Sequence, residues 1–515
     1  MIRALAFILL AAPAGAEGPV APRFAEETAT AGLDSRYAGD WEYMVGGGVA
    51  GFDCSGNGLP DLFLAGGEGP AGLWRNLSEP GGALRFERVA DGPAMDAVTG
   101  AYPLDIDGDG ITDLAVLRVG ENLLLRGLGD CRFERANEAW GFDGGDGWTT
   151  AFAATWEVGQ DWPTLAFGNY VDRREEAFPW GSCTENPLHR PAESGGFAPP
   201  LALTPSHCPL SMLFSDWDRS GRRDLRVSND REYYKGGQEQ LWRMDPAAPP
   251  RLYTAEEGWA RLRLWGMGIA SADVTGDGFP EFYLTSMADN RLQTFAPDGG
   301  PERPHYSDIA LARGVTAHRP FTGGDVRPST AWHPQFADVN NDGRLDLFVA
   351  KGNVDKMPDF ATRDPNNLLV QRADGTFQEM AEQAGVASME ISRGGLVIDL
   401  NADGLLDLVV VNRRAPAQIW RNVTEGAGNW LGVTLRQDHG NHAAIGAWIE
   451  LRTAEGAQHR EITIGGGHVS GAFVPWHFGL GAATEAEVRV IWPDGTEGNW
   501  QRLDAGRVHQ ITQDP

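Results

Sequence analysis

The sequence predicts an all-β protein, a seven-bladed β-propeller with calcium-binding loops followed by a small β-sandwich or barrel-like domain. A nine-residue acidic loop recurs along the chain, and each copy runs directly into a short apolar segment. Successive copies begin roughly 50 to 65 residues apart, somewhat more than the repeat of about 40 to 50 residues that is typical of propeller blades. The final stretch of roughly 90 residues has no such loop but alternates apolar and polar residues, which indicates a separate β domain.

Six copies of the loop carry oxygen-bearing side chains at positions 1, 3, 5 and 9 and a glycine at position 6. The closest copies are DIDGDGITD (105–113), DVNNDGRLD (338–346) and DLNADGLLD (399–407). The looser copies are DCSGNGLPD (53–61), DWDRSGRRD (216–224) and DVTGDGFPE (273–281). A seventh stretch, TWEVGQDWPTLAFGNYV (155–171), lies where another copy is due but has lost most of its carboxylates.

The loop has the donor set of a metal site. Its oxygens converge when the backbone coils tightly, and the glycine permits the bend. Clustered carboxylates repel one another unless a cation lies between them, and Ca²⁺ takes about six to eight oxygens at about 2.3–2.6 Å. A single copy would be explained by an ordinary Asp/Gly turn, but six copies with the same glycine favour Ca²⁺. The predicted ligands are Asp53, Ser55, Asn57, Asp61, Asp105, Asp107, Asp109, Asp113, Asp216, Asp218, Ser220, Asp224, Asp273, Thr275, Asp277, Glu281, Asp338, Asn340, Asp342, Asp346, Asp399, Asn401, Asp403 and Asp407.

These loops differ from EF-hands, which require a Glu at position 12 and flanking helices. The segments after the loops, such as DLFVA and DLVVV, are short and β-rich, which predicts buried strands. Position 12 is apolar in every copy: Leu64, Val116, Val227, Leu284, Val349 and Val410. The sequence therefore predicts strand–loop–strand calcium sites.

Further strands and turns after each loop complete a small antiparallel sheet, and radial stacking of such sheets buries their faces. The segment RFAEETATAGL (23–33) resembles an outer strand without a loop before it, whereas the last unit ends after IWRN without an outer strand. We therefore expect the amino-terminal segment to complete the last unit and close the ring. Residues 171–210 are rich in proline and interrupt the pattern, so they are predicted to be an insertion.

Residues 1–16 have a basic start, an apolar run and a small-residue cleavage site, which predicts a secretory signal peptide and no membrane insertion after its removal. Four cysteines suit an oxidising compartment and permit three pairings. Because Cys183 and Cys208 bracket the proline-rich stretch, their pairing is our first choice, with Cys54 and Cys131 left to pair with each other. The net charge of −28 argues against nucleic acid as a partner.

The predicted domains are a signal peptide at 1–16, a propeller at 17–421 with an insertion at about 171–210, and a β domain at 422–515. The stretch SRGGLVIDLNADGLLDLVVVN (392–412) resembles FG-GAP/VCBS repeats, which are related to the propeller of integrin α chains. The tail resembles the ASPIC/UnbV domain through NHAAIGA (441–447), HFGLG (477–481) and WPDG (492–495), with His442 at a position that is usually basic. The repeats followed by this tail domain resemble the cartilage acidic protein family and its bacterial secreted relatives. That resemblance implies calcium-bound repeats, export and a role in adhesion or extracellular interaction.

The sequence favours a non-catalytic scaffold, secreted or periplasmic, that recognises a glycan or a protein. The alternative is a calcium-dependent hydrolase or lyase acting on carbohydrate, with its site in the central channel or beneath residues 171–210. No GxSxG or HExxH motif is present, and the loops already account for the paired carboxylates. His333 and His477 lie beside aromatic residues and are interpreted as packed, hydrogen-bonded side chains.

Overall fold

The computed structural model describes residues 20–514 apart from 91, 176–181, 232–236 and 247. The predicted signal peptide therefore lies outside the described residues. The regular secondary structure of the described part is nearly all strand, with the short helices α1 (Ala310–Arg313) and α2 (Ala381–Ala384) and one 3₁₀ turn, η1 (Trp41–Tyr43). In this part of the chain no helix has the length and apolar character needed to cross a membrane.

Strand pairing arranges β1–β28 into seven antiparallel groups of four strands. Their first strands contact one another in order, and the last contacts the first, so the groups form a closed ring. The propeller prediction is confirmed. The groups, numbered here as units one to seven, are β2–β5 (Val49–Phe52, Asp61–Leu64, Gly72–Asn76, Phe86–Arg88), β6–β9 (Val98–Leu104, Asp113–Arg118, Leu123–Gly127, Phe133–Arg135), β10–β13 (Thr149–Thr155, Thr164–Asn169, Asn186–His189, Leu201–Leu203), β14–β17 (Pro209–Ser215, Asp224–Asn229, Gln240–Arg243, Arg251–Leu252), β18–β21 (Gly266–Ala272, Glu281–Ser286, Arg291–Phe295, Tyr306–Asp308), β22–β25 (Ala331–Ala337, Asp346–Lys351, Asn367–Gln371, Phe377–Glu379), and β26–β28 (Ser392–Ile398, Asp407–Asn412, Gln418–Asn422) with β1 (Phe24–Glu26).

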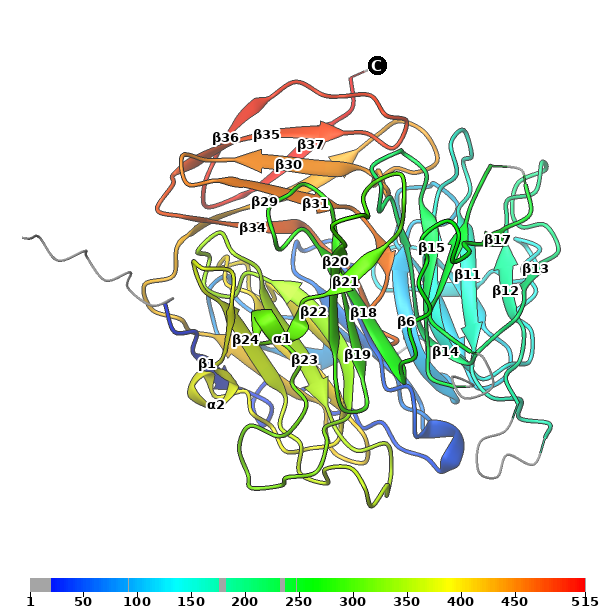
Figure 1. The fold of residues 1–515 in the computed structure, drawn as a ribbon, viewed down its shortest axis with the longest axis horizontal. Helices are drawn as coiled ribbons and strands as arrows, with labels where there is room; N and C mark the ends of the chain where they lie inside the picture. The colour runs from blue at the N-terminus through cyan, green and yellow to red at the C-terminus, as the bar shows by residue number, and fades with distance from the viewer. Residues whose placement is uncertain (1–19, 91, 176–181, 232–236, 247, 515) are drawn as a thin grey trace, which may run out of the picture.

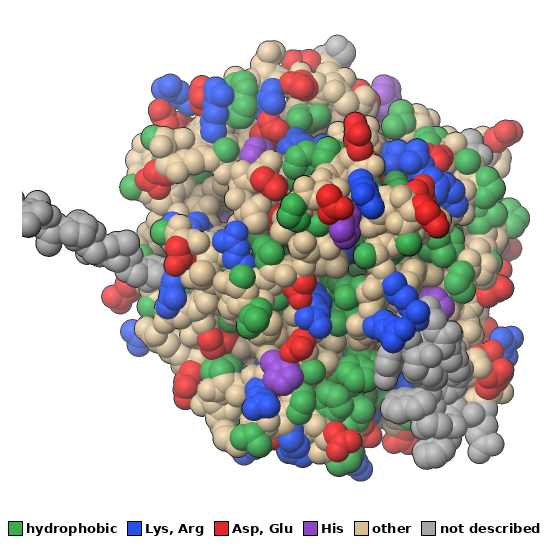
Figure 2. Space-filling model, viewed as in Figure 1, with side chains coloured by type: hydrophobic (Ala, Val, Ile, Leu, Met, Phe, Trp, Pro, Cys, Tyr) green, Lys and Arg blue, Asp and Glu red, His purple; other side chains and the backbone are tan. Residues whose placement is uncertain are grey.

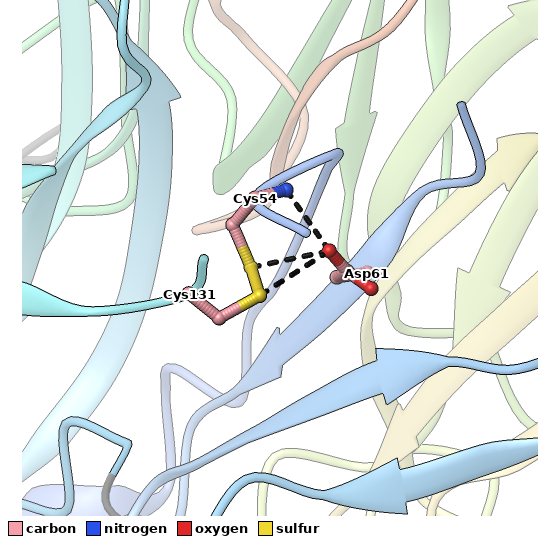
Figure 3. Close-up of side chains that lie close together, drawn as sticks. All are labelled: Cys54, Asp61 and Cys131. Carbon is pink, nitrogen blue, oxygen red and sulfur yellow. Dashed lines mark hydrogen bonds between the residues drawn. A yellow bond between two sulfur atoms is a disulfide. The ribbon is translucent and has the colours of Figure 1, made fainter. Parts of the chain in front are cut away.

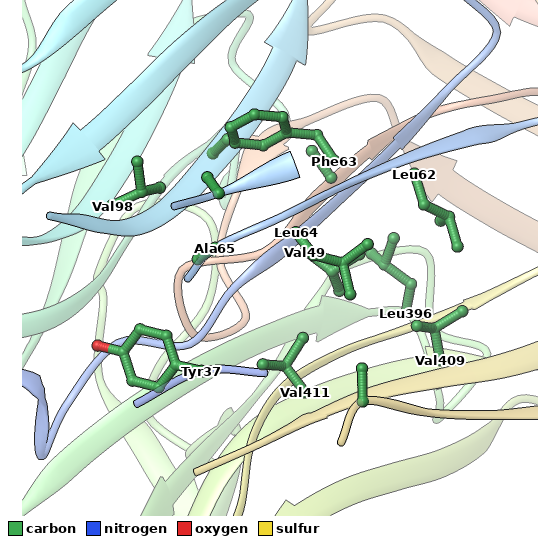
Figure 4. Packing of buried hydrophobic residues seen from close by; sticks show 14 of the residues in the cluster. Tyr37, Val49, Leu62, Phe63, Leu64, Ala65, Val98, Leu396, Val409 and Val411 are labelled. Carbon is green, nitrogen blue, oxygen red and sulfur yellow. The ribbon is translucent and has the colours of Figure 1, made fainter. Parts of the chain in front are cut away.

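The second strand of each unit is buried on both faces, which explains why its sequence is a continuous apolar run rather than an alternating one. Where units one and seven meet, Val49 and Leu64 pack against Leu396, Val409 and Val411 (Figure 4). Burying one such aliphatic side chain stabilises the fold by roughly 1.5–3 kcal/mol. The same kind of packing between neighbouring units holds the ring together.

The amino-terminal strand β1 closes the ring. It pairs antiparallel with β28, with Phe24 opposite Asn422 and Glu26 opposite Trp420. Phe24 is buried in the core between units six and seven. The expectation that the amino-terminal segment supplies the missing outer strand is confirmed.

We expected residues 171–210 to be an insertion into the propeller. The structure instead makes the strands within this range part of the third unit. These strands are β12 and β13, the two outer strands of that unit. The sequence did not reveal these strands because β12 and β13 have only four and three residues and lie in a proline-rich stretch. The predicted disulfides Cys183–Cys208 and Cys54–Cys131 are both present.

The carboxyl-terminal domain lies on one end of the ring (orange and red in Figure 1). Two sheets face each other across a shared apolar core, as the small β domain of the prediction requires. One sheet has the order β34-β29-β37 and the other β31-β30-β35-β36. Their strands are β29 (Asn429–Arg436), β30 (Trp448–Arg452), β31 (Ala457–Glu461), β34 (Trp476–Gly481), β35 (Glu485–Ile491), β36 (Gln501–Asp504) and β37 (Val508–Thr512).

One segment of this domain, residues 464–473, lies inside the propeller ring. Strand β32 (Ile464–Gly465) pairs with both β10 and β14 and joins units three and four into one nine-stranded sheet. Strand β33 (Gly471–Phe473) pairs parallel with β2 of unit one. Between them, single bridges reach β6 and β18. We name residues 464–473 the axial segment; it occupies the central channel in which the enzyme alternative placed a site.

Glycines make this approach possible. A Cβ atom at Gly48 or Gly100 would lie only 1.8 Å or 2.2 Å from the carbonyl oxygen of Val469. In the axial segment itself, the N–H of Gly466 donates to Met212 O at 2.6 Å, and the N–H of Gly467 donates to Ile269 O at 2.6 Å. The run of glycines in the tail, which we had assigned to a separate domain, is therefore required by backbone contact with the ring.

Replacing Phe24 with alanine tests the ring closure. The change removes a buried aromatic side chain, so we expect the free energy of unfolding to fall by about 3 kcal/mol. Glu26→Ala, on the exposed end of the same strand, is the matched control and should change little. Equal thermal melting curves for the two variants would contradict a closing role for β1.

Replacing Gly100 with alanine tests the axial segment. We expect a loss of roughly 1–3 kcal/mol of stability, since the added methyl group meets a carbonyl oxygen that cannot turn away. Gly456→Ala, in the β30–β31 hairpin of the tail domain, adds a methyl group with no neighbour within 4 Å and is the control. Limited proteolysis should release the tail domain more readily from Gly100→Ala than from Gly456→Ala, and equal release rates would count against the assignment.

Candidate metal centres on the loop face

The six acidic loops connect the first and second strands of six units, so that position 9 is the first residue of the second strand. In the third unit the degenerate stretch forms the same connection. There Thr164 donates to Glu157 at 2.9 Å where the other loops have their acidic cluster. The predicted strand–loop–strand arrangement is therefore present in all seven units.

Two residues in every loop have a left-handed backbone. The glycine at position 6 has φ between 81° and 89° in all six copies (Gly58, Gly110, Gly221, Gly278, Gly343 and Gly404). Position 4 is left-handed as well, with φ between 55° and 76° (Gly56, Gly108, Arg219, Gly276, Asn341 and Ala402). The sequence revealed only position 6, because position 4 is a glycine in just half of the copies.

The carboxylate at position 1 is held by the backbone of its own loop. In all six copies it accepts the N–H of the position 6 glycine at 2.7–3.0 Å. In three copies it also accepts the N–H of position 4, at 2.7–2.9 Å. These bonds turn the side chain inward, toward positions 3 and 5.

The acid at position 9 is buried and tied to neighbouring backbone. Asp113, for example, accepts N–H groups from Ile106 and from Gly127 of the third strand, both at 2.7 Å. Burial raises the pKa of Asp113 to about 8 and that of Glu281 to about 7. A carboxylate desolvated in this way is stabilised in its charged form by a bound cation.

The loop at 105–113 has the most compact acidic cluster. Asp105, Asp107 and Asp109 each offer a carboxylate oxygen within 4.8 Å of the others. Arg126 from the third strand pairs with Asp107 at 2.8 Å and with Asp109 at 2.9 Å. The negative charge that remains, together with the nearby Asp113, suits a dication.

The loops at 338–346 and 399–407 have a matching asparagine at position 3. The side-chain amide of Asn340 donates to Asp342 at 3.2 Å, and that of Asn401 donates to Asp403 at 3.1 Å. The Oδ1 atom of Asn401 is buried and has no hydrogen-bond partner among the described residues. Buried acceptor oxygens normally have a hydrogen-bond partner. An unpaired one at a predicted ligand position is available to a cation.

The loop at 53–61 has the weakest donor set. Ser55 Oγ lies 3.4 Å from both Asp53 and Asp61. The Oδ2 atom of Asp61 lies 3.1 Å and 3.5 Å from the sulfurs of Cys54 and Cys131 (Figure 3). These sulfurs are joined in a disulfide and offer no thiolate to a metal.

The loop at 216–224 contains its own cation. The guanidinium of Arg222 lies 2.9 Å from Asp224 and 3.5 Å from Asp218, at positions 9 and 3. In the loop at 273–281, by contrast, the hydroxyl of Thr275 donates to Glu281 at 3.0 Å and no arginine of the loop intervenes. Of the six loops, the one at 216–224 therefore has the least need of a bound metal.

The predicted residues thus fit a hard cation in most copies. The donors are carboxylate, amide and hydroxyl oxygens together with loop carbonyls, which are the ligands that Ca²⁺ prefers. A bound ion would supply positive charge between side chains that are already turned inward. Backbone N–H groups orient the acidic side chains at positions 1 and 9.

The tail domain covers the loops. His442 Nε2 lies 2.7 Å from Gly108 O, His459 Nδ1 lies 2.8 Å from Asp273, and His477 Nε2 lies 2.7 Å from Asn341 Oδ1. The side chain of Glu461 accepts the backbone N–H of Asp216 at 2.6 Å. Trp430 lies against Gly404, where a Cβ atom would be 1.8 Å from the indole nitrogen. Five of the six loops therefore contact the tail.

His333 is buried and His477 is partly exposed, and both side chains are hydrogen-bonded, as interpreted from the sequence. Burial lowers the pKa of His333 to about 4 and that of His477 to about 3, so both are neutral. The Nδ1 atom of His333 accepts the backbone N–H of His468 at 3.1 Å, which leaves the ring proton on Nε2.

A cavity of about 320 Å³ remains at the mouth of the channel, between the axial segment, the ring and the tail. Its walls include the aromatic side chains of Trp430, Phe473 and Trp476. His333 and Arg460 contribute polar groups, and their Nε2 and Nε atoms have no hydrogen-bond partner in the described part of the chain. We name this space the channel-mouth cavity.

The chain matches the ASPIC and UnbV family over residues 437–515 and the FG-GAP-like repeat over residues 53–116. Cartilage acidic protein 1 of Homo sapiens is 26% identical over 337 residues, which cover 55% of this chain and 50% of that protein. The Xenopus tropicalis protein is 32% identical over 237 residues, covering 45% of this chain and 34% of that protein. This chain therefore spans half or less of the length of these curated relatives. A solved structure of the Dos1 propeller aligns with 80% of this chain and 96% of its own, with 9% identity and a TM-score of 0.37.

Removal of calcium tests the loops. In millimolar Ca²⁺ a site with a Kd of about 10⁻⁴ M is at about ten times its Kd and stabilises the fold by about 1.4 kcal/mol. Loss of several such sites on chelation should therefore lower the melting temperature by several degrees. Asp109→Ala should reduce the calcium content by one ion per chain in metal analysis, while Asp130→Ala, an exposed acid outside the loops, should not. An unchanged melting curve together with an absence of bound calcium would show that the loops are ordinary turns.

Proposed function

We propose that this relative of cartilage acidic protein 1, which joins FG-GAP-like repeats to an ASPIC and UnbV domain, is an exported calcium-binding scaffold that recognises a glycan or a protein outside the cytoplasm. The scaffold is secreted or periplasmic and acts by binding rather than by catalysis. Two disulfides and the predicted leader support export.

The role that we propose for calcium is structural. Five of the six loops contact the tail domain, so bound ions would neutralise acidic loops where the ring and the tail meet. Extracellular modules bind Ca²⁺ with Kd values of about 10⁻⁴ to 10⁻³ M, so millimolar external calcium fills about half to nine tenths of such sites. Calcium would then stabilise the position of the tail rather than act as a switch.

The channel-mouth cavity is the observation that carries the recognition proposal. Concave sites with apolar walls and a few unpaired polar groups are typical of ligand pockets, whose volumes are about 300–1,000 Å³. Trp430 and Trp476 offer aromatic faces, and His333 and Arg460 offer N–H donors without acceptors. A ligand in this cavity would contact the ring and the tail at once.

Replacing Trp476 with alanine tests this site. Trp476 lines the cavity and is partly exposed, so its loss should weaken ligand binding at least about tenfold, or about 1.4 kcal/mol, while the protein remains folded. Trp500→Ala is the matched control, because that ring packs on Arg452 and Arg489 away from the cavity.

The measurement is saturable binding to arrays of glycans and of extracellular proteins in millimolar Ca²⁺. The proposal requires at least one ligand that wild-type protein and Trp500→Ala bind alike and Trp476→Ala binds weakly. Absence of any saturable binding would refute it. Calcium-dependent product release from a panel of polysaccharides and esters would support an enzyme instead.

A further inference from the structure

A second cavity, of about 340 Å³, lies beside the first, between units five and six and the tail domain. Its charged lining is mostly cationic, with four arginines against two carboxylates. This composition is unusual in a chain with 43 Lys and Arg and 71 Asp and Glu. We name it the basic cleft; its charged lining residues are Arg313, Arg344, Arg372, Arg460, Asp273 and Asp374, and His459 also lines it.

The arginines come from four separate elements that the fold brings together. Arg313 is the last residue of α1, Arg344 follows the glycine of the loop at 338–346, Arg372 begins the β24–β25 turn, and Arg460 lies on β31 of the tail. On the face drawn in Figure 2, acidic and basic side chains are interspersed over most of the surface. The concentration of arginines in one cleft therefore departs from the rest of the molecule.

Hydrogen bonds across the cleft hold its walls in place. The guanidinium of Arg313 donates to Gly375 O at 2.9 Å, which ties α1 to the β24–β25 turn. The side chain of Gln371 donates to Val274 O at 3.1 Å and joins units five and six. The cleft is thus built by the same contacts that hold the units together.

Most of its positive charge is not neutralised by a carboxylate. Arg313 and Arg372 donate to neutral acceptors, Gly375 O and Gln378 Oε1. The Nε atom of Arg460 is buried and has no hydrogen-bond partner among the described residues. Burial lowers the pKa of Arg460 only to about 10, so this guanidinium stays charged at neutral pH. Of the four arginines, Arg344 pairs with an acid, Asp342.

The two carboxylates of the lining are already engaged. Asp273 accepts N–H groups of its own loop from Gly276 at 2.7 Å and from Gly278 at 2.9 Å, and His459 lies 2.8 Å away. Asp374 accepts the backbone N–H and the hydroxyl of Thr376, at 2.9 Å and 2.6 Å. Both carboxylates keep their negative charge, and Asp273 also attracts Arg460. The four arginines outnumber the two lining carboxylates, so the cleft keeps a net attraction for anions.

We propose that the basic cleft binds the sulfate group of an external ligand, either as free sulfate or as a sulfate ester on a saccharide. Guanidinium groups bind oxyanions through paired N–H donors, and several of them around one cavity suit a tetrahedral anion with oxygens on every side. This inference rests on the proposed recognition function and names the chemical class of ligand for a site distinct from the channel-mouth cavity.

Isothermal titration of the full mature chain in millimolar Ca²⁺ tests the cleft. The probes are sodium sulfate, galactose 6-sulfate and galactose, each at constant ionic strength made up with chloride. Saturable binding of a sulfated probe without binding of galactose supports the proposal. Binding of both sulfated probes identifies the anion itself as the ligand, and binding of the ester alone shows that the sugar contributes.

Arg372→Gln provides the matched variant, because its side chain is exposed on a turn and its loss should not affect folding. We expect it to bind a sulfated probe at least about tenfold more weakly than wild type, the effect of losing one charge-assisted contact. Arg132→Gln changes an exposed arginine in the corresponding β8–β9 turn of unit two and should bind as wild type does.

Equal affinities of Arg372→Gln and Arg132→Gln, or no saturable binding of either sulfated probe, would overturn the assignment. That failure is distinguishable from failure of the recognition function. If array ligands still bind in a way that depends on Trp476, only the basic cleft is refuted, whereas loss of all saturable binding refutes both.

Discussion

The axial segment depends on a close approach of two backbones along the ring axis, and the position of the tail domain depends on the axial segment. The carbonyl oxygen of Val469 occupies the space that a side chain at Gly48 or Gly100 would need. Two short strands of the tail extend sheets of the ring, so each unit they touch gains a hydrogen-bonded neighbour. The ring and the tail are therefore one structural unit, although their sequences have different patterns.

Because the axial segment holds the tail on the loop face, five of the six acidic loops lie against the tail rather than in open solvent. Contacts from His442, His459 and His477 shield parts of three loops from water. Carboxylates in such surroundings favour protonation or a bound cation, as the raised pKa values of Asp113 and Glu281 show. Bound calcium would remove this cost at the interface where the two parts of the protein meet.

The two cavities have a common origin in this docking. Arg460 of the tail lines both of them, and neither would be closed without β31 and the residues around it. The channel-mouth cavity has aromatic walls, and the basic cleft has arginines from three ring elements and one tail strand. Two chemically different surfaces thus lie side by side, and both depend on the tail remaining in place.

Short-range patterns in the sequence were sufficient for much of the fold. The recurring loop, its glycine at position 6 and the apolar run after it determined the strand–loop–strand units, since each depends on residues within about a dozen positions. An outer-strand pattern near residue 24 has no acidic loop before it, and the last unit has no outer strand of its own. These two features were enough to predict that β1 closes the ring. The side chains that the loop backbone turns inward at positions 1 and 9 lie where the repeated loop pattern places them.

Only the tertiary structure decided which distant residues meet. The strands within 171–210 were concealed because each is short and pairs with a neighbour across a long connection. Nothing in the run of glycines at 465–467 indicates the ring axis, because the need for them arises from strands that lie hundreds of residues earlier in the chain. The basic cleft likewise joins Arg313, Arg372 and Arg460 from separate elements, and a cluster that depends on packing of distant segments leaves no local pattern in the sequence.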